Sequence, residues 1–211
     1  MNTERYKYHH GNLRNALIIA AAELIERDGS LDFSMTEAAS HTGVSAAAPY
    51  RHFADKEELL LAVRDLAFLG LGNAAMEKTR LFPTGSIDAI LAMGHTYLNF
   101  AREKRAFFSL MWESRGDIEE RRENALSEHN GFLLLVDLVK AYCEMQGKVD
   151  VRALTLATQI WSVGHGIATL EANHLLDFFD RSIEPEALLD ESVRTMLEGT
   201  IVTRSVQIYS L

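Results

Sequence analysis

The chain has little cysteine, little proline and a shortage of positive charge. Its single cysteine, Cys143, excludes an internal disulfide and a cysteine-rich zinc fold, and it fits a reducing compartment. Only 3 prolines and 13 glycines in 211 residues argue against a loop-rich all-β fold. Lys and Arg together number 21 against 30 Asp and Glu, a formal net charge of −9. That balance disfavours a protein that coats nucleic acid with its whole surface, but it leaves room for a small local DNA-binding face.

Long hydrophobic runs are missing as well. The apolar residues 59–63 are followed by Arg64 and Asp65, and residues 132–136 are followed by Asp137. Neither run approaches the roughly 20 apolar residues that a membrane helix needs. Residues 1–7 are polar and lack the apolar core of a signal peptide. We therefore expect a cytoplasmic protein with no membrane partner.

What the chain does have is helical periodicity over most of its length, and no segment alternates as a strand does. Apolar residues recur at helical spacing from Leu13 to Ile25, with Asn12 placed to cap this first helix and Gly29 to end it. These features predict an amphipathic helix that opens the folded part of the chain.

Capping signals mark three further helix starts. Ser34 precedes Glu37 at the spacing of a capping box, which predicts a short second helix from about Met35. Ser45 is a second cap, with Pro49 in or near the first turn of a third helix. Asp55 precedes Glu58 at the same box spacing and predicts a fourth helix that extends to about Lys78.

The clearest break in the pattern is Leu81 to Gly85, which contains a proline and a glycine. Beyond it we predict helices over Ile87 to about Glu103, Phe107 to Glu113, Ile118 to Met145, Val151 to Phe179, and Pro185 to about Arg204. The predicted fold class is therefore all-α. A three-helix helix-turn-helix domain over 1–60 precedes a larger helical domain over 61–211.

The segment from Ser34 to Leu59 carries the functional signal. Ala39 precedes Gly43 by four residues, so two short helices can cross closely and the glycine can take the tight turn. This is the layout of a helix-turn-helix, whose second helix enters the major groove of DNA. The spacing alone also fits a helical hairpin packed in a core.

The residues that follow favour DNA. Tyr50, Phe53, Lys56 and Leu59 recur at intervals of three. Phe53 and Leu59 can anchor the unit to its core, while Tyr50 and His52 carry polar tips that can bond to phosphate oxygens. Lys56 falls at the start of the fourth helix, where its ammonium and the positive helix end act on the same phosphate.

Residues 36–59 closely resemble the DNA-binding signature of the TetR family of bacterial transcriptional regulators, and the resemblance spans roughly residues 10–65. It implies an all-α homodimer that binds a near-palindromic operator in double-stranded DNA and is usually released by a small molecule. It also implies that a C-terminal domain binds this effector and forms the dimer. No bound cofactor is implied.

Carried over onto this chain, the family's DNA contacts fall on the helix starts Thr36 and Ser45, on the base-facing positions Ala46, Ala47 and Ala48, and on the backbone contacts Tyr50, His52 and Lys56. The three alanines have no side-chain donors and can touch only thymine methyl groups. Base reading is then left to Ser45, Thr36 and Arg51, or to DNA shape.

Charge is a partial objection to DNA binding. Residues 1–60 hold six Lys and Arg against nine Asp and Glu. Their distribution helps, because the arm from Arg5 to Arg14 is locally basic. Its Arg5, Lys7, His9 and His10 can reach phosphates or a minor groove, or else form a disordered tail. We expect binding that depends strongly on dimerisation and on salt.

A second resemblance lies in the larger domain. Residues 161–166 look like the Trp-x-x-x-His-Gly signature of one C-terminal domain class of that family. Such a domain usually binds its small molecule in an apolar cavity between helices, and we expect an apolar or aromatic effector here. The candidate ligand-binding residues are Tyr97, Phe100, Phe107, Met111, Trp112, Trp161 and His165. The alternative is that these residues are ordinary core, with Trp161 and His165 stacked four apart on one helix face.

The last two predicted helices are the candidate dimer surface. One carries an apolar stripe of Leu154, Ala157, Ile160, Val163 and Ile167, and the other a stripe of Leu188, Val193, Met196, Leu197 and Ile201. Both stripes are equally compatible with an internal core.

Signals for catalysis are poor. The sequence holds no phosphate-binding loop and no His-Glu-x-x-His zinc pair, and its histidines are scattered. We therefore predict a regulator that is not an enzyme, most simply a repressor released by its effector. The sequence leaves open an activator. It also leaves open an all-α small-molecule-binding protein or enzyme that has lost DNA binding.

Overall fold

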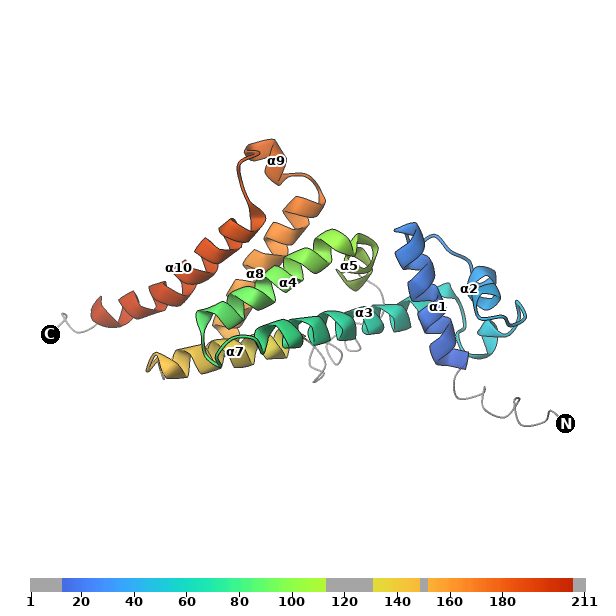
Figure 1. The fold of residues 1–211 in the computed structure, drawn as a ribbon, viewed down its shortest axis with the longest axis horizontal. Coiled ribbons are helices and arrows are strands. Elements are labelled where there is room, and N and C mark those ends of the chain that lie inside the picture. Colours follow the sequence, from blue (N-terminus) through green and yellow to red (C-terminus); the bar gives the residue numbers. More distant parts are fainter. Residues whose placement is uncertain (1–12, 113–130, 149–151, 207–211) are drawn as a thin grey trace. The chain divides into compact units, whose positions relative to one another are not determined.

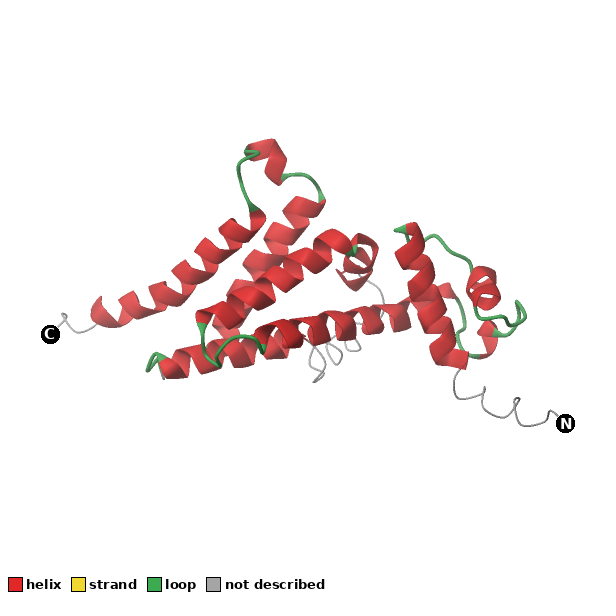
Figure 2. Ribbon diagram, viewed as in Figure 1, coloured by secondary structure: helices red, strands yellow, loops and turns green. Residues whose placement is uncertain are grey.

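The computed structural model describes residues 13–112, 131–148 and 152–206, and every regular element in these ranges is helical (Figures 1 and 2). The elements are α1 (Leu13–Asp28), α2 (Met35–His41), the 3-10 helix η1 (Pro49–Arg51), α3 (Lys56–Thr79), α4 (Ile87–Glu103), α5 (Arg105–Trp112), α7 (Gly131–Met145), α8 (Ala153–Ala172), α9 (Leu176–Phe179) and α10 (Pro185–Val206). The all-α prediction is confirmed for these residues. The predicted cap Asn12, the basic arm of Arg5, Lys7, His9 and His10, and residues 118–130 of a predicted helix lie outside them.

The predicted helix boundaries near the N-terminus are confirmed by their hydrogen bonds. Gly29 has a φ of +62°, and its N–H donates to the carbonyl of Ile25 over 2.9 Å, so the glycine ends α1 in the left-handed region. At the start of α2 the capping box is complete. The Ser34 hydroxyl accepts the N–H of Glu37 over 3.1 Å, and the Glu37 carboxylate accepts the N–H of Ser34 over 2.7 Å.

Residue contacts divide the chain into two compact units. The first comprises Met1–Ala67 together with Lys104–Glu120, and the second comprises Phe68–Glu103 together with Arg121–Leu211. Sequence reasoning placed a domain boundary at residue 60. By contacts the first unit continues to Ala67 within α3 and also takes in α5. The assignment of a DNA-binding domain to 1–60 and of a ligand-binding and dimerisation domain to 61–211 stays a prediction.

The first unit is built around a core to which α1, α2, α3 and α5 contribute, together with Phe53 directly after η1. Its fully buried members include Leu17 of α1, Ala38 of α2, Phe53 after η1, Leu59 of α3 and Leu110 of α5. Burying a leucine or phenylalanine side chain stabilises a fold by about 1.5–3 kcal/mol. The core therefore fixes η1 between α2 and the start of α3.

The second unit is organised around α8, which packs against α4, α7 and α10 (Figure 1). Leu189 of α10 is 1% exposed and lies between two glycines of neighbouring helices. A Cβ built on Gly94 of α4 would come within 2.6 Å of Leu189 Cδ2, and one built on Gly164 of α8 would come within 3.6 Å of its Cδ1. The missing side chains let α4 and α8 approach the leucine of α10.

One predicted helix is wrong. Sequence periodicity indicated a single helix over 151–179, but α8 ends at Ala172 and a separate short helix, α9, begins at Leu176. His174 sits at the break with a φ of 56°, and the N–H of Leu175 reaches back to the carbonyl of Leu170 over 2.9 Å. The helix ends on a left-handed residue that is not glycine, so the usual sequence signal is missing.

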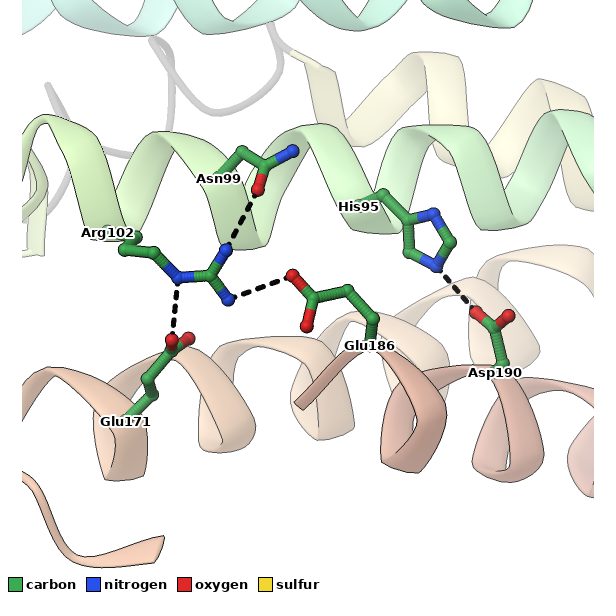
Figure 3. Close-up of polar contacts among 6 residues, drawn as sticks. All are labelled: His95, Asn99, Arg102, Glu171, Glu186 and Asp190. Atoms are coloured by element: carbon green, nitrogen blue, oxygen red, sulfur yellow. Dashed lines mark hydrogen bonds and ion pairs between the residues drawn. The ribbon is translucent and has the colours of Figure 1, made fainter. Parts of the chain in front are cut away.

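A cluster of ion pairs ties α4 to α8 and α10 within the second unit (Figure 3). Arg102 donates from Nε to Glu171 over 2.7 Å, from Nη2 to Glu186 over 2.8 Å and from Nη1 to Asn99 over 3.1 Å. Two turns earlier on α4, His95 Nε2 lies 2.7 Å from Asp190 of α10. Burial opposes ionisation of Glu186, but the hydrogen bonds from Arg102 and from the backbone, with the nearby positive charge, hold the pKa of that carboxyl below its ordinary value.

We predict that Arg102→Ala lowers the free energy of unfolding by about 1 kcal/mol. The variant loses two partly exposed ion pairs made by one planar guanidinium. Each such pair contributes only a fraction of a kcal/mol to the free energy of unfolding. Because the pKa of Glu186 is lowered, its contribution is present near neutral pH and is lost as pH falls through that lowered value. The difference from wild type should therefore disappear in acid. Urea unfolding measures this, with Arg80→Ala, an exposed arginine at the end of α3, as the control. Equal stability of the two variants at neutral pH would contradict the prediction.

Among the described residues, α3 alone is long and apolar enough by composition to cross a membrane, with a mean hydropathy of 1.5 over 18 residues, of which 44% are buried. This corrects the expectation that no stretch approaches such a length, because Arg64 and Asp65 interrupt the run without ending it. Within the first unit its apolar residues Leu59, Leu60 and Val63 belong to the core, which accounts for their composition.

Candidate functional site

The turn between α2 and η1 has the predicted glycine hinge. Gly43 has a φ of +73°, and the next residue, Val44, donates its N–H to the carbonyl of Ala39 over 3.0 Å. Thr42 closes the helix end by donating its hydroxyl to the same carbonyl over 2.9 Å. Ala38 and Ala39 are 0% and 1% exposed, so α2 packs through small side chains directly before the turn. The hinge geometry expected from the sequence is confirmed.

The third helix is shorter than predicted. Residues 45–48 form a turn in which the Ala48 N–H donates to the Ser45 carbonyl over 2.9 Å, and only Pro49–Arg51 form a helix, of the 3-10 type. In an α-helix the carbonyl of residue 45 would accept the N–H of residue 49, and proline has none. Pro49 itself is buried. The recognition segment is therefore a tight turn followed by one 3-10 turn.

This segment turns most of the predicted DNA contacts outwards. Thr36, Ser45, Ala46, Ala47, Tyr50 and Arg51 are exposed, while Ala48, His52 and Lys56 are half-buried. Tyr50 is 57% exposed, whereas Phe53, three residues later, is 1% exposed. As predicted, the tyrosine faces solvent and the phenylalanine is buried in the core. Whether these side chains meet DNA stays a prediction.

The start of α3 fixes Lys56. Asp55 Oδ1 accepts the N–H of Glu58 over 2.9 Å, as the predicted cap requires. The Glu58 carboxylate, however, accepts the N–H of Ala54 over 2.6 Å, one residue earlier than in a regular capping box. Lys56 is the first residue of the helix, and its Nζ lies 4.8 Å from the centroid of the Phe33 ring. Sequence reasoning missed this aromatic contact, since residues 33 and 56 meet only through the fold.

The acidic residues of the first unit are engaged locally, which answers part of the charge objection. Glu37, Asp55 and Glu58 accept backbone N–H groups at helix starts. The hydrogen bond from the Ser34 backbone holds the pKa of Glu37 below its ordinary value. Others form ion pairs: Glu23 with His41, Glu26 with Lys104, and Asp28 with Arg27. Within the described part of the unit, Arg14, Arg51 and Lys56 have no such carboxylate partner.

The second unit holds an aromatic cluster that includes four residues from three helices. Trp161 and His165 of α8 stack with ring centroids 5.3 Å apart, and the His165 Nδ1 lies 2.7 Å from the Tyr97 hydroxyl of α4. Phe132 of α7 meets the edge of Trp161 at 6.1 Å. Three of these residues were candidates for ligand binding. Phe132 was missed, although its place among the aromatic residues of the larger domain was a signal.

The remaining candidates for ligand binding fall in two different units. Phe100 lies half-buried on α4, in the second unit. Phe107, Met111 and Trp112 lie on α5, which belongs to the first unit, and Phe107 packs against that unit's core. The apolar face of α5 is used to cover α1, a pairing that no local pattern in the sequence reveals. A single pocket made of all seven residues stays a prediction.

Burial lowers the pKa of His165 below its ordinary value of 6.5, because a charged imidazolium loses hydration. The unfolded chain therefore binds this proton more readily, and the free energy of unfolding should fall as pH drops from about 6.5 through the lowered value. The slope for one group is at most about 1.4 kcal/mol per pH unit. We predict that His165→Gln flattens the wild-type pH dependence between 7.5 and 5.5, as measured by urea unfolding. His174→Asn, which removes an exposed histidine from a left-handed position, is the control. A wild-type slope in His165→Gln would contradict the assignment.

The stripes of the candidate dimer helices divide between core and surface. The inward members are Ala157, Ile160, Ile167, Val193 and Leu197, each at most 5% exposed. Leu154 is 59% exposed, and Val163, Leu188 and Met196 are half-buried. The side chain of Ile201 lies outside the described residues. The inward side chains therefore serve the internal core, and the exposed and half-buried ones remain as candidates for the dimer surface.

Two family models match the chain. One, described as bacterial regulatory proteins of the tetR family, matches residues 17–63, and the other, a tetracyclin repressor-like C-terminal domain, matches residues 90–196. Among curated proteins, the transcriptional regulator BetI of Brucella anthropi is 33% identical over 112 residues, 52% of this chain and 57% of that protein. BetI of Brucella canis is 36% identical over 93 residues, 43% of this chain and 46% of that protein. The chain thus spans about half the length of the curated relatives it matches.

Solved structures share the fold over nearly the whole chain. A protein of unknown function from Rhodococcus sp. RHA1 is 29% identical with a TM-score of 0.71, covering 92% of this chain and 98% of the other. A TetR family protein from Vibrio parahaemolyticus is 20% identical with a TM-score of 0.61, covering 88% and 96%. RolR, solved with resorcinol, is 14% identical with a TM-score of 0.62, covering 90% and 93%.

Proposed function

The chain belongs to the TetR family of bacterial regulatory proteins, and from this premise we propose that it is a cytoplasmic homodimeric repressor that leaves its operator when a small apolar or aromatic molecule binds. The observation that carries the proposal is the Gly43 hinge with its outward Tyr50 and buried Phe53. Such a hinge sets a short second helix at the surface, where it can enter a major groove.

DNA contact is assigned to the exposed and half-buried side chains around η1. Tyr50, His52 and Lys56 bond to phosphate oxygens and fix the position of the unit on the duplex. Ser45, Thr36 and Arg51 carry the donors that can reach base edges. Ala46, Ala47 and Ala48 offer only methyl groups, so part of the sequence preference comes from DNA shape.

Dimerisation is assigned to the outer faces of α8 and α10. The exposed Leu154 and the half-buried Val163, Leu188 and Met196 supply apolar surface that the protomer leaves partly uncovered. Pairing two copies presents two recognition segments to two operator half-sites, which lie about 34–36 Å apart on one side of B-DNA.

Effector binding is assigned to the aromatic cluster of the second unit. Trp161 and Phe132 offer apolar and aromatic surface, and the hydrogen-bonded pair of Tyr97 and His165 offers a polar handle. A ligand with one ring and one or two polar groups fits this mixture of partners.

The test uses the full chain and duplex DNA from the region flanking its own gene. We expect binding that is at least 10-fold tighter than to a scrambled duplex, with an affinity that falls steeply between 50 and 200 mM salt. A thermal-shift screen of small aromatic compounds should then find one that both stabilises the protein and releases the DNA. Absence of salt-sensitive DNA binding, together with ligand binding or turnover, would overturn the proposal in favour of a protein that has lost its operator.

A further inference from the structure

The first unit holds a second cation that lies on a buried aromatic ring. The guanidinium carbon of Arg14, the second residue of α1, lies 5.0 Å from the centroid of the Phe53 ring. Arg14 is exposed, while Phe53 is 1% exposed and belongs to the core. The ring is therefore a fixed support for a cation that faces solvent.

The position of this support ties Arg14 to the recognition segment. Phe53 follows the exposed Tyr50 by three residues and precedes Lys56 by three. Lys56 lies over Phe33 in the same way, at 4.8 Å. Two buried phenylalanines thus each hold one cation: Phe53 holds Arg14 of α1, and Phe33 holds Lys56 of α3.

The environment of Arg14 leaves its charge available. Arg27 and Lys104 of the same unit are each paired with a carboxylate, but the described residues give Arg14 none. A cation–π contact uses none of the five N–H donors of a guanidinium in a hydrogen bond, so they stay able to bind phosphate oxygens, whose geometry they match. Support by the ring also limits the side-chain freedom that would be lost on binding.

We propose that Arg14 is a further phosphate-binding residue of the DNA interface, held in position by Phe53. The inference rests on the proposed function, since it adds a contact to the same site. Sequence reasoning counted Arg14 in the locally basic arm but gave phosphate contact only to Arg5, Lys7, His9 and His10. Because phosphate contacts carry no sequence information, Arg14 should contribute equally to operator and to random DNA.

The test measures the binding constant of the full chain for both duplexes as a function of NaCl concentration. Each phosphate contact contributes about 0.9 to the slope of log K against log salt, so loss of Arg14 from both protomers should reduce the slope by about 1.8. We expect this reduction in Arg14→Gln and Arg14→Met, with about 10-fold weaker binding at low salt. Arg14→Lys should keep the wild-type slope. Arg80→Gln, which removes an exposed arginine directly after α3, should change neither quantity.

Two outcomes overturn the inference while the proposed function stands. One is a wild-type salt slope in folded Arg14→Gln and Arg14→Met. The other is weaker binding with an unchanged slope, since that would mean Arg14 acts only through the fold. The methionine variant keeps an apolar stem against Phe53, so it reports on charge even if the glutamine variant is unstable. If the wild type itself shows no salt-dependent DNA binding, the proposed function fails and the inference falls with it.

Discussion

The double variant Tyr50→Ala, Lys56→Ala should bind operator DNA roughly 1,000-fold or more weakly than the wild type. Under the proposed function each side chain makes one hydrogen bond to a phosphate, and a hydrogen bond to a charged group contributes about 1.5 kcal/mol or more. Two copies of the chain bind one operator, so each substitution removes its contact twice. Four such contacts add up to about 6 kcal/mol, which corresponds to a loss of about four orders of magnitude in the binding constant.

The measurement is fluorescence anisotropy with a labelled duplex at fixed salt, supported by thermal unfolding to show that the variant folds. Tyr50 is 57% exposed, and removing its ring should hardly change stability. Lys56→Arg keeps the charge and should retain most of the affinity. Lys78→Ala, an exposed lysine near the end of α3, is the control. If the double variant binds as tightly as the wild type, the assignment of the DNA-binding face is wrong.

The second large effect is expected from Phe53→Ala. Phe53 is 1% exposed and lies in the core of the first unit beside Leu59 and Leu17. Truncating a buried phenylalanine to alanine typically costs 3–5 kcal/mol, because the cavity left behind only partly collapses. Such a loss is comparable to the whole stability of a small unit, so we expect α1 and α2 to lose their protection and DNA binding to disappear.

Hydrogen exchange distinguishes local from global unfolding here. The amides of α1 and α2 should exchange much faster in Phe53→Ala, while those of α8 in the second unit keep their protection. Phe178→Ala, which truncates a phenylalanine that is 81% exposed on α9, is the matched control and should change little. Unchanged protection of α1 in Phe53→Ala would show that the ring does not anchor the recognition segment.

Features of the first unit that depend on local chemistry were predictable. The start of α2 at Met35 follows from Ser34 and Glu37, whose side chains satisfy each other's backbone N–H groups within one turn. The hinge at Gly43 follows from a backbone angle that other residues adopt with difficulty. The exposure of Tyr50 and the burial of Phe53 agree with their chemistry, because the tyrosine hydroxyl is a polar tip and phenylalanine has none.

Features that depend on tertiary surroundings, or that lack the usual local signal, could not be predicted from the sequence. The 3-10 form of η1 follows from a proline whose effect on the carbonyl of Ser45 depends on the turn around it. The break at His174 has no glycine to announce it. Phe107 of α5 packs against the core of the first unit, and nothing within residues 105–112 says which helix the apolar face of α5 will meet.

The amino-acid sequence by itself determined the helical class, most helix boundaries, the glycine hinge and the family, because each of these depends on residues within a few positions of one another. Tertiary structure alone decided that Arg14 and Lys56 lie on the rings of Phe53 and Phe33, that Phe132 joins Tyr97, Trp161 and His165, and that Arg102 links three helices. These contacts join residues far apart in the chain. They form only when the apolar faces of several helices are buried together, and that packing is a property of the whole unit.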